Sequence, residues 1–278
     1  MKASADAILR VHGSKSIINR ILIICTFLDK PIKLTNFSNC SDVETFVENL
    51  MIFGFRFEFA EDDVIIYPHK IGSENLYIKD AGTTFRFLLT RLATAEGSKN
   101  IIQISEQLHA RPHSQLIDII KQLGGSISDD FPLIIKGKKL QGGRIKIIGK
   151  TSSQFVSSIL LSAPNFKNGI CLELSDEAVS VDYIKLTLSI MHDFGINFTW
   201  KGNIIDIPAG QNYQNILEYD VEPDYSTVCY YWALAAISNK TLITAGNPRK
   251  SYQADAKFIG ILEEIGAKID LDEEAVTI

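Results

Sequence analysis

The chain has 278 residues, of which 46% are hydrophobic and 22% charged, with a net charge of -5. This balance is typical of a soluble globular protein and argues against a broad nucleic-acid surface. The longest apolar run near the N-terminus, 17–28, is interrupted by Asn19 and Arg20. It therefore predicts neither a membrane span nor a secretory leader, and we expect a cytoplasmic protein.

A turn rich in glycine or hydroxyl side chains opens an apolar helix four times, about 70 residues apart. The four turns are Gly13-Ser14-Lys15-Ser16, Ala81-Gly82-Thr83-Thr84, Thr151-Ser152-Ser153-Gln154 and Pro223-Asp224-Tyr225-Ser226. Free backbone N–H groups at the start of a helix attract anions. The pattern therefore predicts several anion sites directed at one cleft.

A second helix in each unit is predicted to end on a glycine. These residues, spaced by 70, 71 and 71 positions, are Gly54, Gly124, Gly195 and Gly266. Each suits the left-handed cap with which a chain commonly leaves a helix. The sequence therefore contains four copies of one unit.

The second copy indicates the order of elements within a unit. Its periodicity predicts a helix over 83–95, a strand over 100–105 and a second helix over 112–123. A hairpin over 126–135 turns at Asp129-Asp130, and a strand over 144–148 leads into the next unit. Helices and strands alternate, so we expect an α/β (α+β) fold.

The cysteines and histidines give no metal-binding pattern. Cys25, Cys40, Cys171 and Cys229 have no paired spacing, and free thiols in apolar stretches commonly act as small core residues. His109 and His113 flank Arg111-Pro112, a predicted helix start, and need not share a face. We therefore expect no metal site.

Cations collect at predicted helix starts, where the helix dipole disfavours them. They are Lys15, Arg20, Arg86 and Arg111. Each alone is compatible with a solvated or paired surface charge, but together they favour an oxyanion ligand. The chain lacks both the Gly-Lys pair of a P-loop and a G-x-G-x-x-G fingerprint after a strand.

Six motifs in order resemble those of the 5-enolpyruvylshikimate-3-phosphate synthase family of enolpyruvyl transferases. They are Gly13-Ser14-Lys15-Ser16-Ile17-Ile18-Asn19-Arg20, Asp80-Ala81-Gly82-Thr83-Thr84-Phe85-Arg86, Arg111-Pro112, Ser152-Ser153-Gln154, Ser180-Val181-Asp182-Tyr183 and Glu222-Pro223-Asp224-Tyr225-Ser226. The resemblance implies six βαβαββ units in two lobes. About four are present: residues 11–212 as the first lobe, and 1–10 with 213–278 as an incomplete second lobe.

The resemblance also implies a reaction. The family transfers the enolpyruvyl group of phosphoenolpyruvate to the 5-hydroxyl of shikimate 3-phosphate and releases phosphate, in the shikimate pathway to chorismate and aromatic amino acids. It uses no metal or cofactor, and the complete protein is expected to be a monomer. Two alternatives are a UDP-N-acetylglucosamine 1-carboxyvinyltransferase and a truncated, non-catalytic anion-binding protein.

Site residues are carried over position by position. The resemblance places shikimate 3-phosphate against Lys15, Ser16, Arg20, Ser152, Ser153, Gln154, Ser180, Tyr183 and Asp224. It places phosphoenolpyruvate against Lys15, Gly82, Arg111 and Gln154. Asp224 is the candidate base and Lys15 a second catalytic candidate, whereas Thr83 and Arg86 are expected to be structural supports. Helix capping is the alternative role for the serines and for Asp224.

Two positions depart from the family pattern. Asp80 stands where many relatives carry Asn. Near the start of the fourth unit's second helix, Gln253 and Lys257 stand in for a Lys and an Arg of a Lys-Glu-x-x-Arg pattern, which leaves the acid-base assignment there open.

Overall fold

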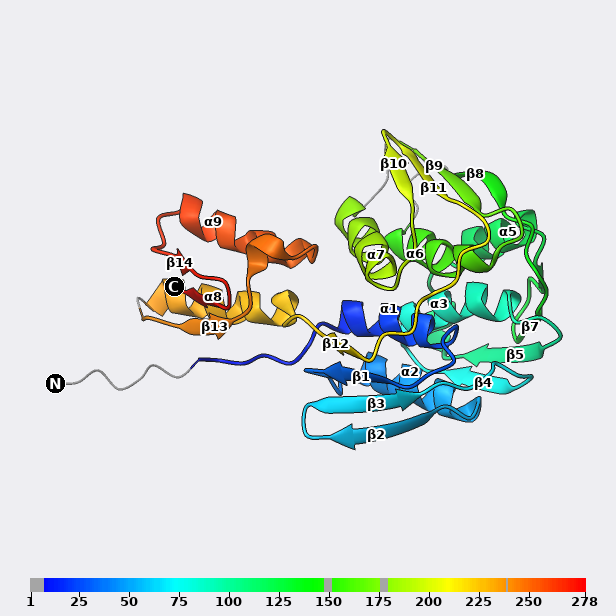
Figure 1. Cartoon of the computed structure of the whole chain (residues 1–278), viewed down its shortest axis with the longest axis horizontal. Coiled ribbons are helices and arrows are strands. Elements are labelled where there is room, and N and C mark those ends of the chain that lie inside the picture. The colour runs from blue at the N-terminus through cyan, green and yellow to red at the C-terminus, as the bar shows by residue number, and fades with distance from the viewer. Residues whose placement is uncertain (1–7, 148–151, 176–179, 239) are drawn as a thin grey trace.

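The computed structural model describes residues 8–147, 152–175, 180–238 and 240–278. Figure 1 shows a larger and a smaller part joined by extended chain; we call them the three-unit region and the fourth unit. Helices of the three-unit region are α1 (Lys15–Cys25), α2 (Ser41–Ile52), α3 (Gly82–Ala93), α4 (Glu106–His109), α5 (Ser114–Gln122), α6 (Ser153–Ser162) and α7 (Val181–Asp193).

The strands of the three-unit region form three mixed sheets. They are β1 (Ile32–Thr35), β2 (Arg56–Ala60), β3 (Asp63–Tyr67), β4 (Asn75–Ile78), β5 (Lys99–Ile104), β6 (Ser126–Ile127), β7 (Leu133–Lys136), β8 (Gly143–Ile147), β9 (Ile170–Leu174), β10 (Thr199–Lys201), β11 (Ile204–Ile207) and β12 (Glu218–Asp220). The sheet orders are β12-β1-β3-β2, β4-β5-β7-β6 and β8-β9-β11-β10. In each, the first two strands run parallel and the rest antiparallel. The repeated unit is therefore confirmed.

The fourth unit contains α8 (Tyr225–Ser238), β13 (Ile243–Ala245), α9 (Phe258–Glu264), β14 (Asp270–Leu271) and β15 (Ala275–Thr277). Its sheet has the order β13-β15-β14. Leu9 forms a parallel bridge with Thr244, in the place that a first parallel strand occupies in the other units. Leu9 therefore extends the sheet of the C-terminal unit.

The segment that follows residue 212, the predicted end of the first lobe, packs with the three-unit region. β12 completes the first sheet by pairing with β1. Tyr213 and Val221 belong to the large core of the three-unit region, whereas a second, smaller core is formed around Tyr225 and Trp232. The chain therefore leaves the three-unit region after Val221, because the first unit has no parallel strand of its own before α1.

The helices lie inside the three-unit region, with the sheets around them (Figure 1). α1, α3 and α6 contact one another. In α1, every residue from Ile17 to Cys25 is buried, as expected of a helix that is enclosed on all sides. These three helices are the first helices of their units, so their contact gathers three of the four predicted turns.

The glycine caps are also confirmed. Gly54, Gly124, Gly195 and Gly266 have φ angles of 92°, 90°, 82° and 97°, and each follows the residue that caps α2, α5, α7 or α9. Only glycine adopts this left-handed conformation without steric cost.

Elements of the second unit match their predictions within a few residues, apart from the short α4, which the sequence analysis missed. The cysteines are free thiols, and Cys25 is fully buried in the core. No helix among the described residues is both long and apolar enough to cross a membrane.

Candidate functional site

A cavity of about 320 Å³ lies where the starts of five helices meet, α1, α3, α6, α7 and α8. Its lining residues are Lys15, Ser16, Arg20, Thr83, Phe87, Ser153, Gln154, Tyr183, Asp224 and Ser226. Seven of the predicted site residues are among them. The three-unit region provides one wall, and the start of α8 in the fourth unit provides the other.

Three lining residues were not assigned to a ligand by the sequence analysis. Thr83 and Ser226 belong to the hydroxyl-rich turns, so their motif could have indicated them. Phe87 lies one helical turn beyond Thr83 and is 1% exposed; its apolar character gave no signal that distinguishes it from a core residue.

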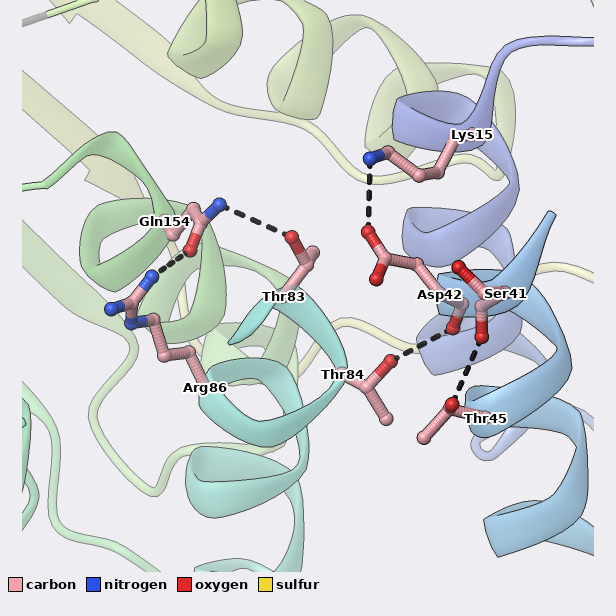
Figure 2. Close-up of polar contacts among 8 residues, drawn as sticks. All are labelled: Lys15, Ser41, Asp42, Thr45, Thr83, Thr84, Arg86 and Gln154. Carbon is pink, nitrogen blue, oxygen red and sulfur yellow. Dashed lines mark hydrogen bonds and ion pairs between the residues drawn. The ribbon is translucent and has the colours of Figure 1, made fainter. Parts of the chain in front are cut away.

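Lys15 forms an ion pair that the sequence did not predict. Its Nζ lies 2.9 Å from Oδ2 of Asp42, in the first turn of α2 (Figure 2). Burial lowers the pKa of Lys15, but the hydrogen bond and charge of Asp42 outweigh burial, so the pKa is raised. The ammonium is therefore charged at neutral pH. The sequence offered one indication of this pair, since Asp42 is an acidic residue in the first turn of a helix.

Arg20 is a buried cation without a carboxylate partner among the described residues. Its guanidinium donates to the Ser16 carbonyl at 2.6 Å, the Tyr183 carbonyl at 3.2 Å and the Thr187 hydroxyl at 2.8 Å. A fourth bond, at 3.3 Å, goes to Ser157. Burial lowers the pKa of Arg20 to about 10, so it too stays charged at neutral pH. Arg20 ties α1 to α7 and brings uncompensated positive charge to the cavity.

The predicted serines divide into lining and capping residues. Ser153 lines the cavity. Ser152 caps α6 by accepting a hydrogen bond from the Gln154 amide at 3.3 Å, and Ser180 precedes α7 with a φ angle of 63°. Neither Ser152 nor Ser180 lines the cavity, and Thr151, of the same turn as Ser152, lies outside the described residues.

Gln154 is held between two residues of α3 (Figure 2). Arg86 donates from Nη1 to the amide oxygen of Gln154, while the Gln154 nitrogen donates to the Thr83 hydroxyl at 3.1 Å. Arg86 is 8% exposed, and its Nε has no hydrogen-bond partner. Thr83 and Arg86 thus hold the two ends of the Gln154 amide.

Gly82 and Arg111 lie beside each other but outside the 320 Å³ cavity. A Cβ atom added to Gly82 would lie 3.1 Å from Nη1 of Arg111 and 3.4 Å from Nη1 of Arg86. Burial and the charge of Arg111 lower the pKa of Arg86. The Arg111 side chain has no hydrogen-bond or ion-pair partner within the described residues, so two guanidinium groups face Gly82 without a neutralising acid.

Asp224 lines the cavity at the start of α8. Its Oδ1 accepts a hydrogen bond from the Ser226 amide at 3.1 Å, so it also caps the helix. Burial raises its pKa, against the opposing effect of hydrogen bonds from Ser226. Burial likewise raises the pKa of Tyr183, another residue of the cavity wall.

Gln253 and Lys257 do not line the cavity. The Gln253 amide is buried and is used inside the fourth unit, where its nitrogen donates to Glu222 at 3.0 Å and to the Pro223 carbonyl at 2.9 Å. Lys257 pairs with Asp182 of α7 at 2.7 Å and so connects the two parts of the molecule. The proposed stand-ins for the family's Lys and Arg therefore have other partners here.

Two further predictions concern Asp80 and the histidines. Asp80 is exposed and accepts a hydrogen bond from the Ser105 hydroxyl at 2.5 Å. His109 and His113 both contact the ring of Phe131. Within the described ranges, no group of three His, Cys, Asp or Glu residues is placed to hold a metal ion.

Comparisons with known proteins point to one family. The model of the family described as EPSP synthase (3-phosphoshikimate 1-carboxyvinyltransferase) matches residues 2–278. Proteins named 3-phosphoshikimate 1-carboxyvinyltransferase from Pseudoalteromonas atlantica and Psychromonas ingrahamii are 31% and 32% identical over 97% and 99% of this chain. The chain spans 66% and 67% of those two proteins.

A solved structure has the same fold. The EPSP synthase from Acinetobacter baumannii superposes with a TM-score of 0.83 at 19% identity, over 98% of this chain and 64% of that one. The repeated mixed sheets described above thus form about two thirds of a known fold.

Proposed function

The chain belongs to the EPSP synthase (3-phosphoshikimate 1-carboxyvinyltransferase) family, and from that premise we propose that its cavity binds shikimate 3-phosphate as the acceptor of an enolpyruvyl group. The observation that carries this proposal is the division of charge across the cavity. Lys15 and Arg20 lie on the wall formed by the three-unit region, while Asp224 lies on the wall formed by α8. One end thus suits a phosphate and the other a hydroxyl group.

The phosphate end is built from cations and hydroxyl groups. Arg20 contributes a buried charge, and Ser16 and Ser153 add hydroxyl donors at helix starts. Each charge-assisted hydrogen bond to a phosphate oxygen contributes roughly 1.5 to 3 kcal/mol. Lys15, which remains protonated beside Asp42, acts in this proposal through its charge rather than as a proton donor.

Asp224 is proposed as the base for the 5-hydroxyl. It accepts the hydroxyl proton as that oxygen bonds to C2 of phosphoenolpyruvate, and the electron pair of the C2–C3 double bond takes a proton from solvent at C3. Loss of a C3 proton and of inorganic phosphate from the tetrahedral intermediate then restores the double bond. A pKa raised by burial suits a base better than that of an exposed aspartate, because proton affinity increases with pKa.

Phosphoenolpyruvate is proposed to bind at the start of α3. Arg86 and Arg111 face Gly82 there, and a planar guanidinium can hold a carboxylate or phosphate with two parallel hydrogen bonds. Gln154 connects this place to the cavity, since it lines the cavity and accepts from Arg86. No acid among the described residues neutralises the two arginines, which supports an anionic occupant.

Calorimetry of the 278-residue chain with shikimate 3-phosphate tests the proposal. We expect binding that UDP-N-acetylglucosamine does not compete with, and that Arg20→Met abolishes. Preference for UDP-N-acetylglucosamine would favour the alternative acceptor. Equal affinity for inorganic phosphate and shikimate 3-phosphate would favour a non-catalytic anion-binding protein.

Phosphate release from phosphoenolpyruvate tests the chemical step separately. Because the chain spans about two thirds of its relatives, we expect these 278 residues to bind the acceptor weakly and to show no turnover. Robust enolpyruvyl transfer by the purified chain would contradict this expectation.

A further inference from the structure

Asp42 holds the Lys15 side chain at the edge of the cavity. The pair links the first turn of α2 to the first residue of α1 at 2.9 Å (Figure 2). Asp42 is itself held in place, because its backbone carbonyl accepts a hydrogen bond from the Thr84 hydroxyl of α3 at 3.3 Å. Three helix starts are therefore connected through one carboxylate residue that does not line the cavity.

We propose that Asp42 is a positioning residue for the site: it fixes the Lys15 ammonium for an anionic ligand and sets the alkaline limit of ligand binding. This inference rests on the proposed function. An ammonium has three donors. Asp42 takes one, which leaves two for a phosphate oxygen in the cavity.

The pair differs from an ordinary surface ion pair in its surroundings. Another pair on α2, Glu48 with Lys79 at 3.2 Å, has side chains that are 58% and 60% exposed, and neither residue lines the cavity. The Asp42 and Lys15 side chains are 31% and 44% exposed, and Lys15 is a lining residue. Glu48 is therefore a matched control on the same helix.

The groups around Lys15 determine its charge. Asp42 and Cys40 approach from the α2 side and Asp224 from the start of α8, and all three favour the protonated form. Tyr183 of α7 also interacts with the Lys15 charge. Because burial lowers the Lys15 pKa while Asp42 raises it, removing the Asp42 charge must lower that pKa. Binding that depends on the ammonium is then lost at a lower pH.

Two effects of the Asp42→Asn substitution on ligand affinity have opposite signs. Asp42→Asn removes a negative charge near an anionic ligand, which by itself would tighten binding. Fixing the Lys15 side chain works the other way, since a free lysine must be ordered when the ligand binds. The sign of the change in affinity therefore distinguishes a positioning residue from a merely nearby acid.

The experiment measures shikimate 3-phosphate binding by calorimetry from pH 7 into the alkaline range. At neutral pH we expect Asp42→Asn to weaken binding roughly two- to tenfold, the cost of ordering one long side chain, and to move the alkaline loss of binding to lower pH. Asp42→Glu should recover part of the affinity. Glu48→Gln should change neither the affinity at neutral pH nor the pH at which binding is lost. A Cys40→Ser background removes thiol ionisation. Equal or tighter binding by Asp42→Asn across the range would overturn the proposal.

A second readout needs no ligand. Titration of ¹³Cε-labelled lysine by NMR, with Lys15 identified by loss of its signal in Lys15→Arg, reports its pKa directly. We expect a lower Lys15 pKa in Asp42→Asn and no change in Glu48→Gln. An unchanged Lys15 pKa in Asp42→Asn contradicts this inference, whereas absence of shikimate 3-phosphate binding by the unaltered chain contradicts the proposed function.

Discussion

The three-unit region and the fourth unit share one repeated arrangement of helices and strands, but they differ in how completely their helices are buried. In the former, α1, α3 and α6 cover one another, and α1 is buried from its third residue onward. In the latter, α8 is more apolar than α1, yet Tyr230, Leu234 and Ile237 on it are 80%, 63% and 85% exposed. One unit cannot bury its own helices; neighbouring units do so.

In the proposed function, the residues for ligand binding and the residue for catalysis lie mostly in different parts of the molecule. Six of the seven predicted residues in the cavity come from the enclosed region, and only Asp224 comes from the fourth unit. Lys257 with Asp182 provides an ion pair across the junction. The enclosed region thus carries the groups that we propose to bind the anion, while the more open unit carries the proposed base.

The largest expected effect is that of Asp224→Asn on turnover. In any preparation that releases phosphate, we expect a rate lower by about 10²- to 10⁴-fold, the usual loss for a general base, with shikimate 3-phosphate binding retained. Because burial raises the Asp224 pKa, turnover of the unaltered site should fall as the pH drops through that raised value. Near-normal steady-state turnover by Asp224→Asn would remove it from the base role.

The two cores allow a direct test of whether the three-unit region and the fourth unit unfold independently. Phe85 and Trp232 are both fully buried, in the large and small cores respectively. Truncation to Ala should cost about 3 to 5 kcal/mol at either position. We expect Trp232→Ala to abolish hydrogen-exchange protection in α8 and β13 but to leave α1 protected. Simultaneous loss of protection in both parts would show that they unfold as one.

Arg111→Ala tests whether the two ligands use separate groups. Arg111 lies outside the cavity and beside Gly82. We expect phosphoenolpyruvate binding to weaken about 10- to 100-fold, as for loss of a charge-assisted pair, and shikimate 3-phosphate binding to change less than about twofold. Equal weakening of both in binding measurements would assign Arg111 a structural role.

The exposed face of α8 predicts self-association. Apolar side chains repeated at positions 230, 234 and 237 form one stripe along a helix. Leu234→Lys with Ile237→Lys should abolish concentration-dependent association in analytical ultracentrifugation, while stability changes by less than about 0.5 kcal/mol, as at other exposed sites. Phe59→Lys, at an exposed position of β2, is the control and should leave association unchanged.

The smallest expected effect concerns stability at the junction. Since burial raises the pKa of Asp224 in the folded chain, the folded state is more stable with this side chain protonated, and it loses that contribution as the pH rises through the raised value and the carboxylate forms. Asp224→Asn keeps a capping side chain and should therefore raise the thermal midpoint slightly at pH 7. A thermal midpoint at pH 7 that is lower in Asp224→Asn than in the unaltered chain would contradict this prediction.

Much of the fold followed from local patterns in the sequence. The glycine caps, helix starts and period of about 70 residues are set by backbone conformation and by neighbouring residues, so four units could be counted without tertiary contacts. The motifs also indicated seven of the ten cavity residues.

Only the tertiary structure decided which segments complete each unit and which charges meet. β12 joins β1 from 185 positions away, and no local pattern marks such a partner. Tyr213 and Val221 therefore lie in the core of the three-unit region. Asp42 pairs with Lys15, which lies 27 positions away in the sequence. The Gln253 side-chain nitrogen donates hydrogen bonds to Glu222 and to the Pro223 carbonyl. Sequence predicts which residues can form hydrogen bonds, but the choice among partners depends on distances that only packing sets.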